Sequence, residues 1–534
     1  MGIYLNPGNS GFAQICRGEY VDKTGLVELI NQRINGPENL LCISRPRRFG
    51  KSYAAKMLVA YYDRSCNSHV LFDDKKIAET TDYRKHLNKY SVIYLDITTF
   101  ISEALTQNRL LQDVPGMIQE ALLKDLAECG FQVREGDSLN DNLVRIAGQP
   151  DGGKFVFVID EWDAVIREAK DDPEAQNKFL TFLRGWFKNG QFTPKVVAAA
   201  YMTGILPIKK DGSQSSISEF DEYSMVKPLF FDKYVGFTED EVRCLCEKNN
   251  VDFKTMKQWY DGYVFRNVGS VYNPNSVMKS IRFDEFDSYW TETSAAEGLM
   301  DYISKGYKAL TRTIAELIGG VAVKVSITGF ANDLTTFRGR DDVLTLMIHL
   351  GYLAYDAENQ TVRIPNEEIK LEFQKAVRDV KHEATMKRLE ESDQLFFDTI
   401  HEKADAVAAQ IEKIHMEENV PLHYNKEDSL RSVIKLAYYT YRDHYVQFEE
   451  LPGGEGFADV VYFPRHDSDW PTLVIELKWN KTARGAIDQI LNKKYANVAE
   501  NFGTDILLVG VNYEKDAPPG KRKHTCSIVR YEVK

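Results

Sequence analysis

The feature that most constrains the fold is an apolar run that leads through a basic loop into an amphipathic stretch. Residues 40–44 have the composition of a short buried strand, and residues 45–52 end in Gly-Lys-Ser. Apolar residues at helical spacing begin at Tyr53. In a strand, loop and helix of this kind, backbone amides and the helix N-terminus bind phosphate. The order therefore predicts a P-loop within an α/β fold.

The whole loop is assigned to nucleotide binding. We expect Lys51 to reach the terminal phosphates of ATP and Ser52 to hold Mg²⁺. Arg45 stands where G-x-x-x-x-G-K-[ST] has its first glycine, so Gly-Lys-Ser is a weak match that needs a partner motif. The residues assigned to the nucleotide are Arg45, Pro46, Arg47, Arg48, Phe49, Gly50, Lys51 and Ser52.

The partner motif is a second apolar run that ends in two carboxylates. Residues 155–159 are all apolar and are followed by Asp160 and Glu161, the pattern of a Walker B strand. In that role Asp160 orients the Mg²⁺ shell and Glu161 polarises the attacking water. A third apolar run ends in Thr203 and Gly204. Each pattern alone could be an ordinary strand end, but together and in this order they favour an ATPase core.

A different constellation lies near the end of the chain. Asp459 opens one strand-like run, and Glu476 and Lys478 close another. Residues two apart on a strand point to the same face, so Glu476 and Lys478 lie side by side, and a hairpin would bring Asp459 to them. Two carboxylates and an ammonium can hold a divalent ion and steady an attacking water. This pattern predicts metal-dependent phosphodiester hydrolysis.

Two further residues extend that constellation. Glu427 begins a helical pattern upstream, and Gln489 lies on a helical pattern downstream of Lys478. The order Glu, Asp, Glu-x-Lys, Gln resembles the PD-(D/E)XK nuclease superfamily, with Ala458 in place of the proline. The resemblance implies that Glu427, Asp459 and Glu476 bind Mg²⁺ or Mn²⁺. It also implies that Lys478 positions the nucleophile and Gln489 supports the site.

Several segments together resemble the bacterial AAA-ATPase-like family, whose members usually carry a C-terminal PD-(D/E)XK domain. The matching segments are residues 20–24, 44–52, 160–163, 203–206, 259–263 and 271–274. The resemblance implies that Thr203 is a polar sensor of the γ-phosphate, and that Arg45 is usual in this loop. A role in genome defence or mobile-element biology follows from the domain pairing by analogy alone.

The predicted organisation has five parts. Residues 1–235 alternate apolar strands with amphipathic helices, as expected of a parallel AAA-like P-loop core, and residues 236–295 are expected to form a helical lid. Residues 296–382 resemble a winged-helix module, and residues 383–420 are predicted to be a helical connector. Residues 421–534 are predicted to be the restriction-endonuclease-like α/β domain.

Composition narrows the setting. The 43% hydrophobic and 27% charged content is that of a globular protein, and no stretch approaches the ~18 apolar residues of a membrane span. Scattered cysteines and the absence of a signal-peptide pattern predict a cytoplasmic protein. The net charge of −12 argues mildly against the nuclease interpretation, because non-specific nucleic-acid binders usually carry a basic face. DNA is still the expected partner, together with ATP.

The leading interpretation is an ATP-binding P-loop ATPase coupled to a metal-dependent nuclease that acts on DNA. A second interpretation is a nucleotide-dependent switch whose C-terminal domain recognises nucleic acid without cutting it. A third is a signalling ATPase whose nucleotide-dependent assembly is the output. The sequence leaves the oligomeric state open.

Overall fold

The computed structural model divides the chain into two compact units. One comprises Met1–Tyr302 and Lys324–Glu372, and the other Ile303–Val323 and Phe373–Lys534. The residues that the structure describes are 2–208, 217, 219–290, 308–328, 330, 339–379, 383–418, 434, 438, 445–453, 456–464, 470–493, 505–514 and 523–532.

The core of the first unit is a parallel sheet with the order β2-β3-β4-β1-β5. Its strands are β1 (Leu40–Ser44), β2 (Ser91–Asp96), β3 (Phe155–Asp160), β4 (Val197–Gly204) and β5 (Asp221–Tyr223). β1, β3 and β4 are buried along their whole length, which explains their continuous apolar sequences. This is the α/β P-loop core that the sequence predicts.

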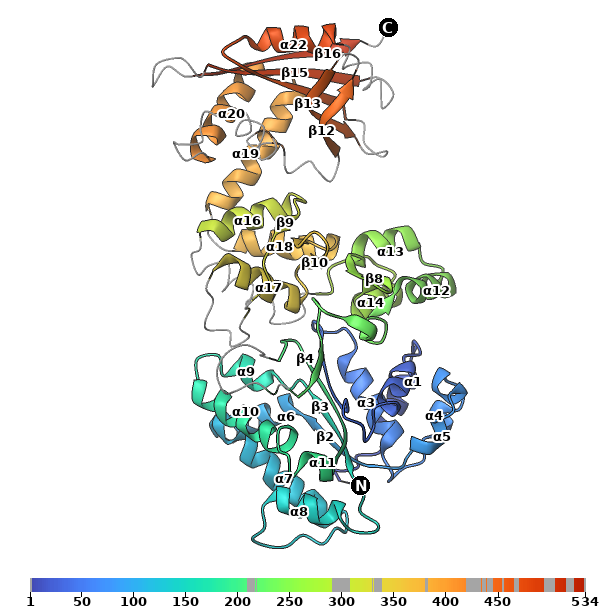
Figure 1. The fold of residues 1–534 in the computed structure, drawn as a ribbon. Coiled ribbons are helices and arrows are strands. Elements are labelled where there is room, and N and C mark those ends of the chain that lie inside the picture. Colours follow the sequence, from blue (N-terminus) through green and yellow to red (C-terminus); the bar gives the residue numbers. More distant parts are fainter. Residues whose placement is uncertain are drawn as a thin grey trace. The chain divides into compact units, whose positions relative to one another are not determined.

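Helices cover both faces of this sheet (Figure 1). α3 (Lys51–Tyr62) lies on one face, and α6 (Ile97–Thr106), α7 (Val114–Glu128) and α10 (Pro173–Phe187) lie on the other. The remaining helices of this part are α1 (Ser10–Cys16), α2 (Gly25–Asn31), α4 (His69–Phe72), η1 (Lys76–Glu79), α5 (Tyr83–His86), η2 (Leu111–Asp113), α8 (Leu139–Ala147), α9 (Ala164–Glu168), α11 (Thr193–Val196) and η3 (Leu229–Phe231).

A small helical region with its own core follows the sheet. It contains α12 (Glu239–Asn249), α13 (Phe253–Tyr260) and α14 (Pro274–Phe283) around the sheet β6-β8-β7, formed by β6 (Phe237–Thr238), β7 (Tyr263–Phe265) and β8 (Gly269–Tyr272). A capping box begins α12: the Thr238 hydroxyl accepts from the Glu241 N–H at 3.4 Å, and the Glu241 carboxylate accepts from the Thr238 N–H at 2.8 Å.

The middle of the chain has the helix, two strands and helix that the sequence predicts. α17 (Arg340–Leu350) is followed by the hairpin of β10 (Ala354–Asp356) and β11 (Thr361–Arg363), and then by α18 (Glu367–Asp379). β9 (Val323–Lys324) completes a three-stranded sheet with the order β10-β11-β9. Its role as a winged-helix module stays a prediction.

The second unit is built on a mixed sheet with the order β12-β13-β14-β15-β16. The strands are β12 (Tyr445–Gly453), β13 (Gly456–Pro464), β14 (Thr472–Trp479), β15 (Asp505–Tyr513) and β16 (His524–Glu532), and only β14 and β15 are paired in parallel. α22 (Ala483–Asn492) packs on one face through Ile487 and Ile490. α19 (Glu383–Ile400) and α20 (Ala404–Glu418) pack on the other (Figure 1).

The segment expected to be a connector is therefore part of a core. Leu395 and Phe396 of α19 and Val407 and Ile411 of α20 are fully or almost fully buried against the sheet. α16 (Lys308–Ile318) lies against α19. Within the described part of the chain, no helix is both long and apolar enough to cross a membrane.

Candidate functional site

The P-loop lysine is held by the first residues of its own loop and by Glu161. Gly50, at φ +93°, caps α3, and Lys51 is its first residue. The Lys51 ammonium donates to the main-chain oxygens of Arg45 at 3.1 Å and Pro46 at 2.9 Å. It also lies 3.3 Å from the Glu161 carboxylate. A buried cation is thus aligned with the N-terminus of a helix, an arrangement that suits an anion.

The carboxyl ends of β3 and β4 bring Asp160 and Thr203 together, because the two strands are neighbours and parallel. The Thr203 hydroxyl donates to Asp160, and the Glu161 N–H donates to Thr203 Oγ1 at 3.4 Å. Burial raises the pKa of Asp160, and hydrogen bonds from Ser52 and Thr203 oppose that shift. Ser52, Asp160 and Thr203 therefore converge although they are distant in sequence.

Glu161 has an unusual backbone conformation, and two cations contact its carboxylate. Its φ of +52° lies in the left-handed region, which is costly for a residue with a side chain. Arg167 of α9 lies 2.5 Å from its carboxylate, opposite the Lys51 contact. Burial alone would raise the pKa of Glu161, but Lys51 and Arg167 outweigh it and the pKa is lowered. Glu161 is therefore an ionised acceptor.

Sequence reasoning missed Arg167 and the structural part that Asp163 plays. Arg167 also pairs with Asp163 at 3.1 Å, one helical turn away. The Asp163 carboxylate accepts from the N–H groups of Ile205 at 3.1 Å and Leu206 at 2.9 Å, just beyond β4. The spacing of Asp163 and Arg167 by four residues at the start of a helix was the signal available in the sequence.

Arg45 points away from the phosphate-binding side of its loop. Its side chain is fully buried, and it donates to the main-chain oxygens of Ser44 at 3.0 Å and Tyr223 at 3.2 Å. The guanidinium lies 5.0 Å from the centre of the Phe265 ring, and burial lowers its pKa to about 10. Arg45 thus braces the loop through its side chain, while only its carbonyl meets Lys51.

The loop is also braced from the middle of the chain. Gly351, which ends α17 at φ +87°, lies so close to Pro46 that a Cβ atom there would be 2.7 Å from the proline ring. The Tyr263 hydroxyl donates to the Gly351 carbonyl.

Arg47, another residue of the loop, is affected by its neighbours. Burial lowers the pKa of Arg47, and the positive charge of Arg167 adds to that effect.

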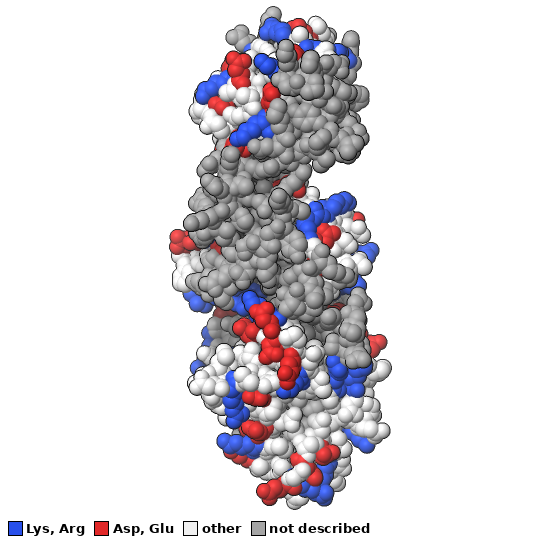
Figure 2. All heavy atoms as spheres, turned by 90° about the vertical axis from the view of Figure 1, so that its left-hand side faces the viewer, with Lys and Arg blue, Asp and Glu red and all other residues white. Residues whose placement is uncertain are grey.

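A cavity of about 460 Å³ opens beside Lys51. Loop residues 48–52 and Glu161 line it, together with residues from 19–23, 234–237 and α14. Its charged lining comprises five cations and two anions: Lys23, Arg48, Lys51, Lys279, Arg282, Glu19 and Glu161. By contrast, Figure 2 shows basic and acidic side chains side by side on one face of the molecule. The cavity is thus locally suited to a polyphosphate, and sequence reasoning missed Lys279 and Arg282.

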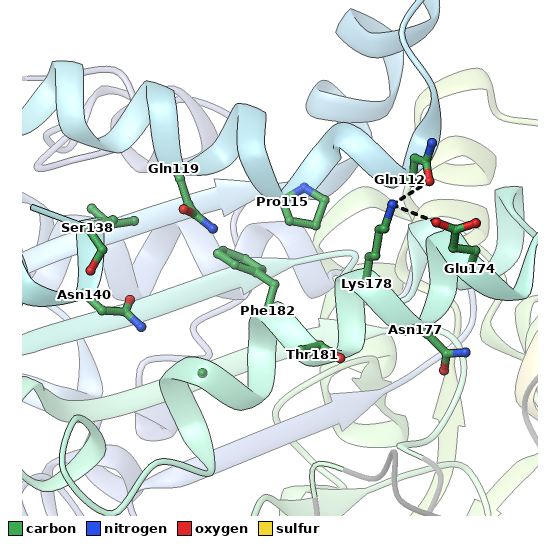
Figure 3. Close-up of a pocket in the computed structure, with 12 residues that line it drawn as sticks. Gln112, Pro115, Gln119, Ser138, Asn140, Glu174, Asn177, Lys178, Thr181 and Phe182 are labelled. Atoms are coloured by element: carbon green, nitrogen blue, oxygen red, sulfur yellow. Dashed lines mark hydrogen bonds and ion pairs between the residues drawn. The ribbon is translucent and has the colours of Figure 1, made fainter. Parts of the chain in front are cut away.

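A second cavity, of about 750 Å³, lies over α7, α8 and α10 (Figure 3). Its lining is mostly amide, hydroxyl and apolar side chains. The charged groups there neutralise each other, since Lys178 contacts Glu174 at 2.8 Å and Gln112 at 2.7 Å. None of the predicted site residues lines it, and we assign it no ligand.

In the second unit, four of the predicted residues come together. Val460 of β13 pairs with Ile475 of the antiparallel strand β14. Asp459 and Glu476, the next residue on each strand, therefore lie opposite each other. The Asp459 carboxylate accepts from the Leu477 N–H at 2.8 Å. Lys478 donates to Glu476 Oε1 at 2.7 Å, and Gln489 of α22 donates to the same oxygen.

Glu476 is the most constrained group of this cluster. Only 3% of it is exposed, and its Oε2 atom has no hydrogen-bond partner among the residues that the structure describes. Burial raises the pKa of Glu476, the charge of Asp459 adds to the rise, and Lys478 opposes it. Glu427 lies outside the described residues. Among the described residues, no group of three or more His, Cys, Asp or Glu side chains is arranged to hold a metal ion.

Gly510 sets the distance between α22 and the sheet. It pairs with Glu476 in the parallel β14–β15 ladder. A Cβ atom at this position would lie 2.3 Å from the Ala483 carbonyl and 2.9 Å from the Ala486 Cβ. Only glycine lets the helix approach closely enough for Gln489 to reach Glu476. A lone glycine inside an apolar strand was the signal in the sequence.

Comparison with known proteins finds a family match for the part of the chain that contains the first of these two sites. Residues 8–213 match the family model described as "Predicted AAA-ATPase". This range contains β1, the P-loop, β3 and β4, and with them every nucleotide-site residue predicted from the sequence. An uncharacterized protein in the vnfD 5′ region of Azotobacter chroococcum mcd 1 is 24% identical over 535 residues, which is 96% of each chain.

Solved structures with some likeness to the chain include two nucleotide complexes. The ORC2 protein of Aeropyrum pernix, as ADPNP–ADP complexes, is 12% identical and covers 68% of this chain and 96% of its own, at a TM-score of 0.32. AMPPCP-bound DnaA from Aquifex aeolicus is 9% identical and covers 69% and 90%, at a TM-score of 0.27. The parallel sheet of this chain, rather than these distant likenesses, defines the fold.

Proposed function

We propose that the first unit binds ATP with Mg²⁺ and hydrolyses it. The observation that carries this proposal is the convergence of Lys51, Ser52, Asp160, Glu161 and Thr203 beside the cationic cavity. The match of residues 8–213 to a predicted ATPase family supports it. A polyphosphate would compete with Glu161 for the Lys51 ammonium. The carboxylate oxygen that it frees could then accept a hydrogen bond from the attacking water.

The residues around Asp160 fit a magnesium ion. The Ser52 hydroxyl and the Asp160 carboxylate are hard oxygen donors, and they already share a hydrogen bond. The ion, when bound, neutralises charge on the transferred phosphoryl group. Thr203 orients Asp160, and to act as a sensor its hydroxyl would have to turn from Asp160 to the γ-phosphate. The lowered pKa of Glu161 keeps that carboxylate ionised at neutral pH.

For the second unit we propose metal-dependent cleavage of DNA. The unpartnered, buried Oε2 of Glu476 beside Asp459 is the observation that supports a divalent ion there. Asp459, Glu476 and Glu427 would hold the ion, which activates water. Lys478 would leave Glu476 to meet the scissile phosphate, and Gln489 would keep Glu476 oriented.

The second candidate is a nucleotide switch whose C-terminal unit binds nucleic acid without cutting it. It is favoured by the two donors, Lys478 and Gln489, that occupy the same oxygen of Glu476. Either function fits a coupling in which the ATP state governs the C-terminal unit.

One matrix of assays tests the proposal. ATP binding, ATP hydrolysis and cleavage of plasmid DNA are measured for the full chain with Mg²⁺ or Mn²⁺. Lys51→Ala should weaken ATP binding about ten- to a hundredfold through loss of a charge-assisted contact, and Glu161→Gln should bind ATP without turnover. Asp459→Ala should abolish cleavage and leave hydrolysis intact. Wild-type chain that hydrolyses ATP but cuts no DNA with either metal would favour the switch.

A further inference from the structure

The helix α14 turns one face toward the nucleotide cavity. Asn275, Met278, Lys279 and Arg282 all line it, and their spacing of three, four and seven residues is that of a single helical stripe. α14 lies in the helical region, whereas Lys51 and Ser52 lie in the P-loop. If the phosphates of a nucleotide bind at the P-loop, its sugar and base must therefore contact other parts of the lining.

Part of that lining is an apolar wall. Val21, Phe237 and Met278 all line the cavity; Phe237 belongs to the buried cluster of the helical region, and the other two are partly buried against it. The aromatic side chains of Tyr20 and Tyr234 line the cavity too. Flat, apolar surfaces of this kind suit the face of a nucleobase. Met278 and Asn275 are one turn apart, so Asn275 lies at the edge of the wall.

Asn275 lines the cavity, and its side chain carries an unsatisfied polar group. Its Nδ2 atom is buried and has no hydrogen-bond partner among the described residues. Its main-chain N–H donates to the side chain of Asn273, the N-cap of α14, at 2.9 Å, so the residue itself is well anchored. A buried donor without a partner is costly, and a bound ligand that supplies an acceptor removes that cost.

We propose that Asn275 reads the adenine base of the bound nucleotide. Its carboxamide donates to N7 and accepts from the N6 amino group, the bidentate pairing that asparagine makes with adenine. Guanine presents two acceptors, O6 and N7, on that edge and cannot complete the pair. Glu19, a carboxylate of the lining that could otherwise serve the amino group of guanine, is paired with Lys248 at 2.8 Å.

This inference rests on the proposed nucleotide site, and one set of titrations separates the two. Dissociation constants for ATP, GTP and 7-deaza-ATP, which lacks the N7 acceptor, are measured by calorimetry on the full chain. The wild type should bind ATP about ten- to a hundredfold more tightly than GTP, and more tightly than 7-deaza-ATP, as expected for a bidentate base contact. In Asn275→Leu the three constants should converge.

Two further variants make the result decisive. Asn275→Asp keeps an acceptor but loses the donor, so it should bind ATP and 7-deaza-ATP equally. Asn267→Leu, an exposed asparagine of the same region outside the cavity lining, should keep the wild-type preference. Loss of ATP binding in Lys51→Ala together with equal wild-type affinity for ATP and 7-deaza-ATP would overturn the base-reading role alone. Unchanged ATP binding in Lys51→Ala would overturn the nucleotide site itself.

Discussion

At the residue scale, several charged side chains are buried with only partial compensation. Glu368 of α18 is one of them, and its pKa is strongly raised although it lies outside the proposed nucleotide site. It accepts from the Ser276 hydroxyl at 2.8 Å and from the Tyr289 N–H at 2.9 Å, and it is 1% exposed. Burial raises its pKa to about 8, the nearby Glu372 adds to the rise, and Arg48 of the P-loop opposes it.

Because of Glu368, the free energy of unfolding of the first unit should fall at alkaline pH. Because its folded-state pKa lies above the ordinary value of 4.5, the stabilisation is complete at acid pH and is lost as the pH rises through about 8. Glu368→Gln keeps the acceptor for Ser276 and Tyr289 and removes the titration, so it should be more stable than wild type at pH 9, by at most roughly 3–5 kcal/mol. Thermal melts from pH 5 to 9, with Glu367→Gln as the control, measure this. Parallel pH profiles for wild type and Glu368→Gln would show that the carboxylate does not titrate there.

At the element scale, local pattern predicted the strands of the first sheet well, because a strand buried on both faces must be continuously apolar. β1, β3 and β4 lie where the sequence places them. The order β2-β3-β4-β1-β5 was not predictable, since it depends on pairing between distant segments.

The site residues divide in the same way. Residues that stand in a motif, such as Lys51 and Glu476, could be predicted from the sequence as candidates. Arg167, Gly510 and Asn275 could not, because each matters only through what a separate element brings beside it. The packing of α19 and α20 was missed because the many charged residues of this stretch suggest a solvent-exposed connector. Its apolar residues that pack in the core, such as Leu395 and Val407, are spaced apart in the sequence.

Gly510 gives a prediction for the contact between α22 and the sheet. Gly510→Ala places a methyl group against the Ala483 carbonyl, so the helix must shift and Gln489 must leave Glu476. Overpacking of this kind costs about 1–3 kcal/mol, and DNA cleavage should fall with it. Gly116→Ala, where no atom lies within 4 Å of the new Cβ, serves as the matched control. Full cleavage by Gly510→Ala would mean that the position of α22 does not matter for the chemistry.

At the scale of the whole molecule, the C-terminal sheet depends on helices that precede it in the sequence. Leu395, Phe396, Val407 and Ile411 cover its face toward α19 and α20. A fragment that starts at residue 421 leaves that face open, and exposed apolar surface of this kind favours aggregation.

A fragment of residues 383–534 should consequently be far more soluble than one of residues 421–534. Gel filtration and amide exchange on the two fragments measure the difference. Leu395→Asp in the longer fragment should reproduce the behaviour of the shorter one, because it places a charge in the covered face. Equal solubility of both fragments would restore the view of residues 383–420 as a simple connector.

The division of the chain also bears on the order in which the protein is made. Ile303–Val323 belongs to the second unit, but the next stretch, Lys324–Glu372, belongs to the first. The apolar face of α16, including Leu310, Ile314 and Leu317, therefore leaves the ribosome before α19 exists. At roughly 5–20 residues per second, that face waits for several seconds during synthesis. The whole sequence of the first unit is thus made before α19, the partner of α16 in the second unit.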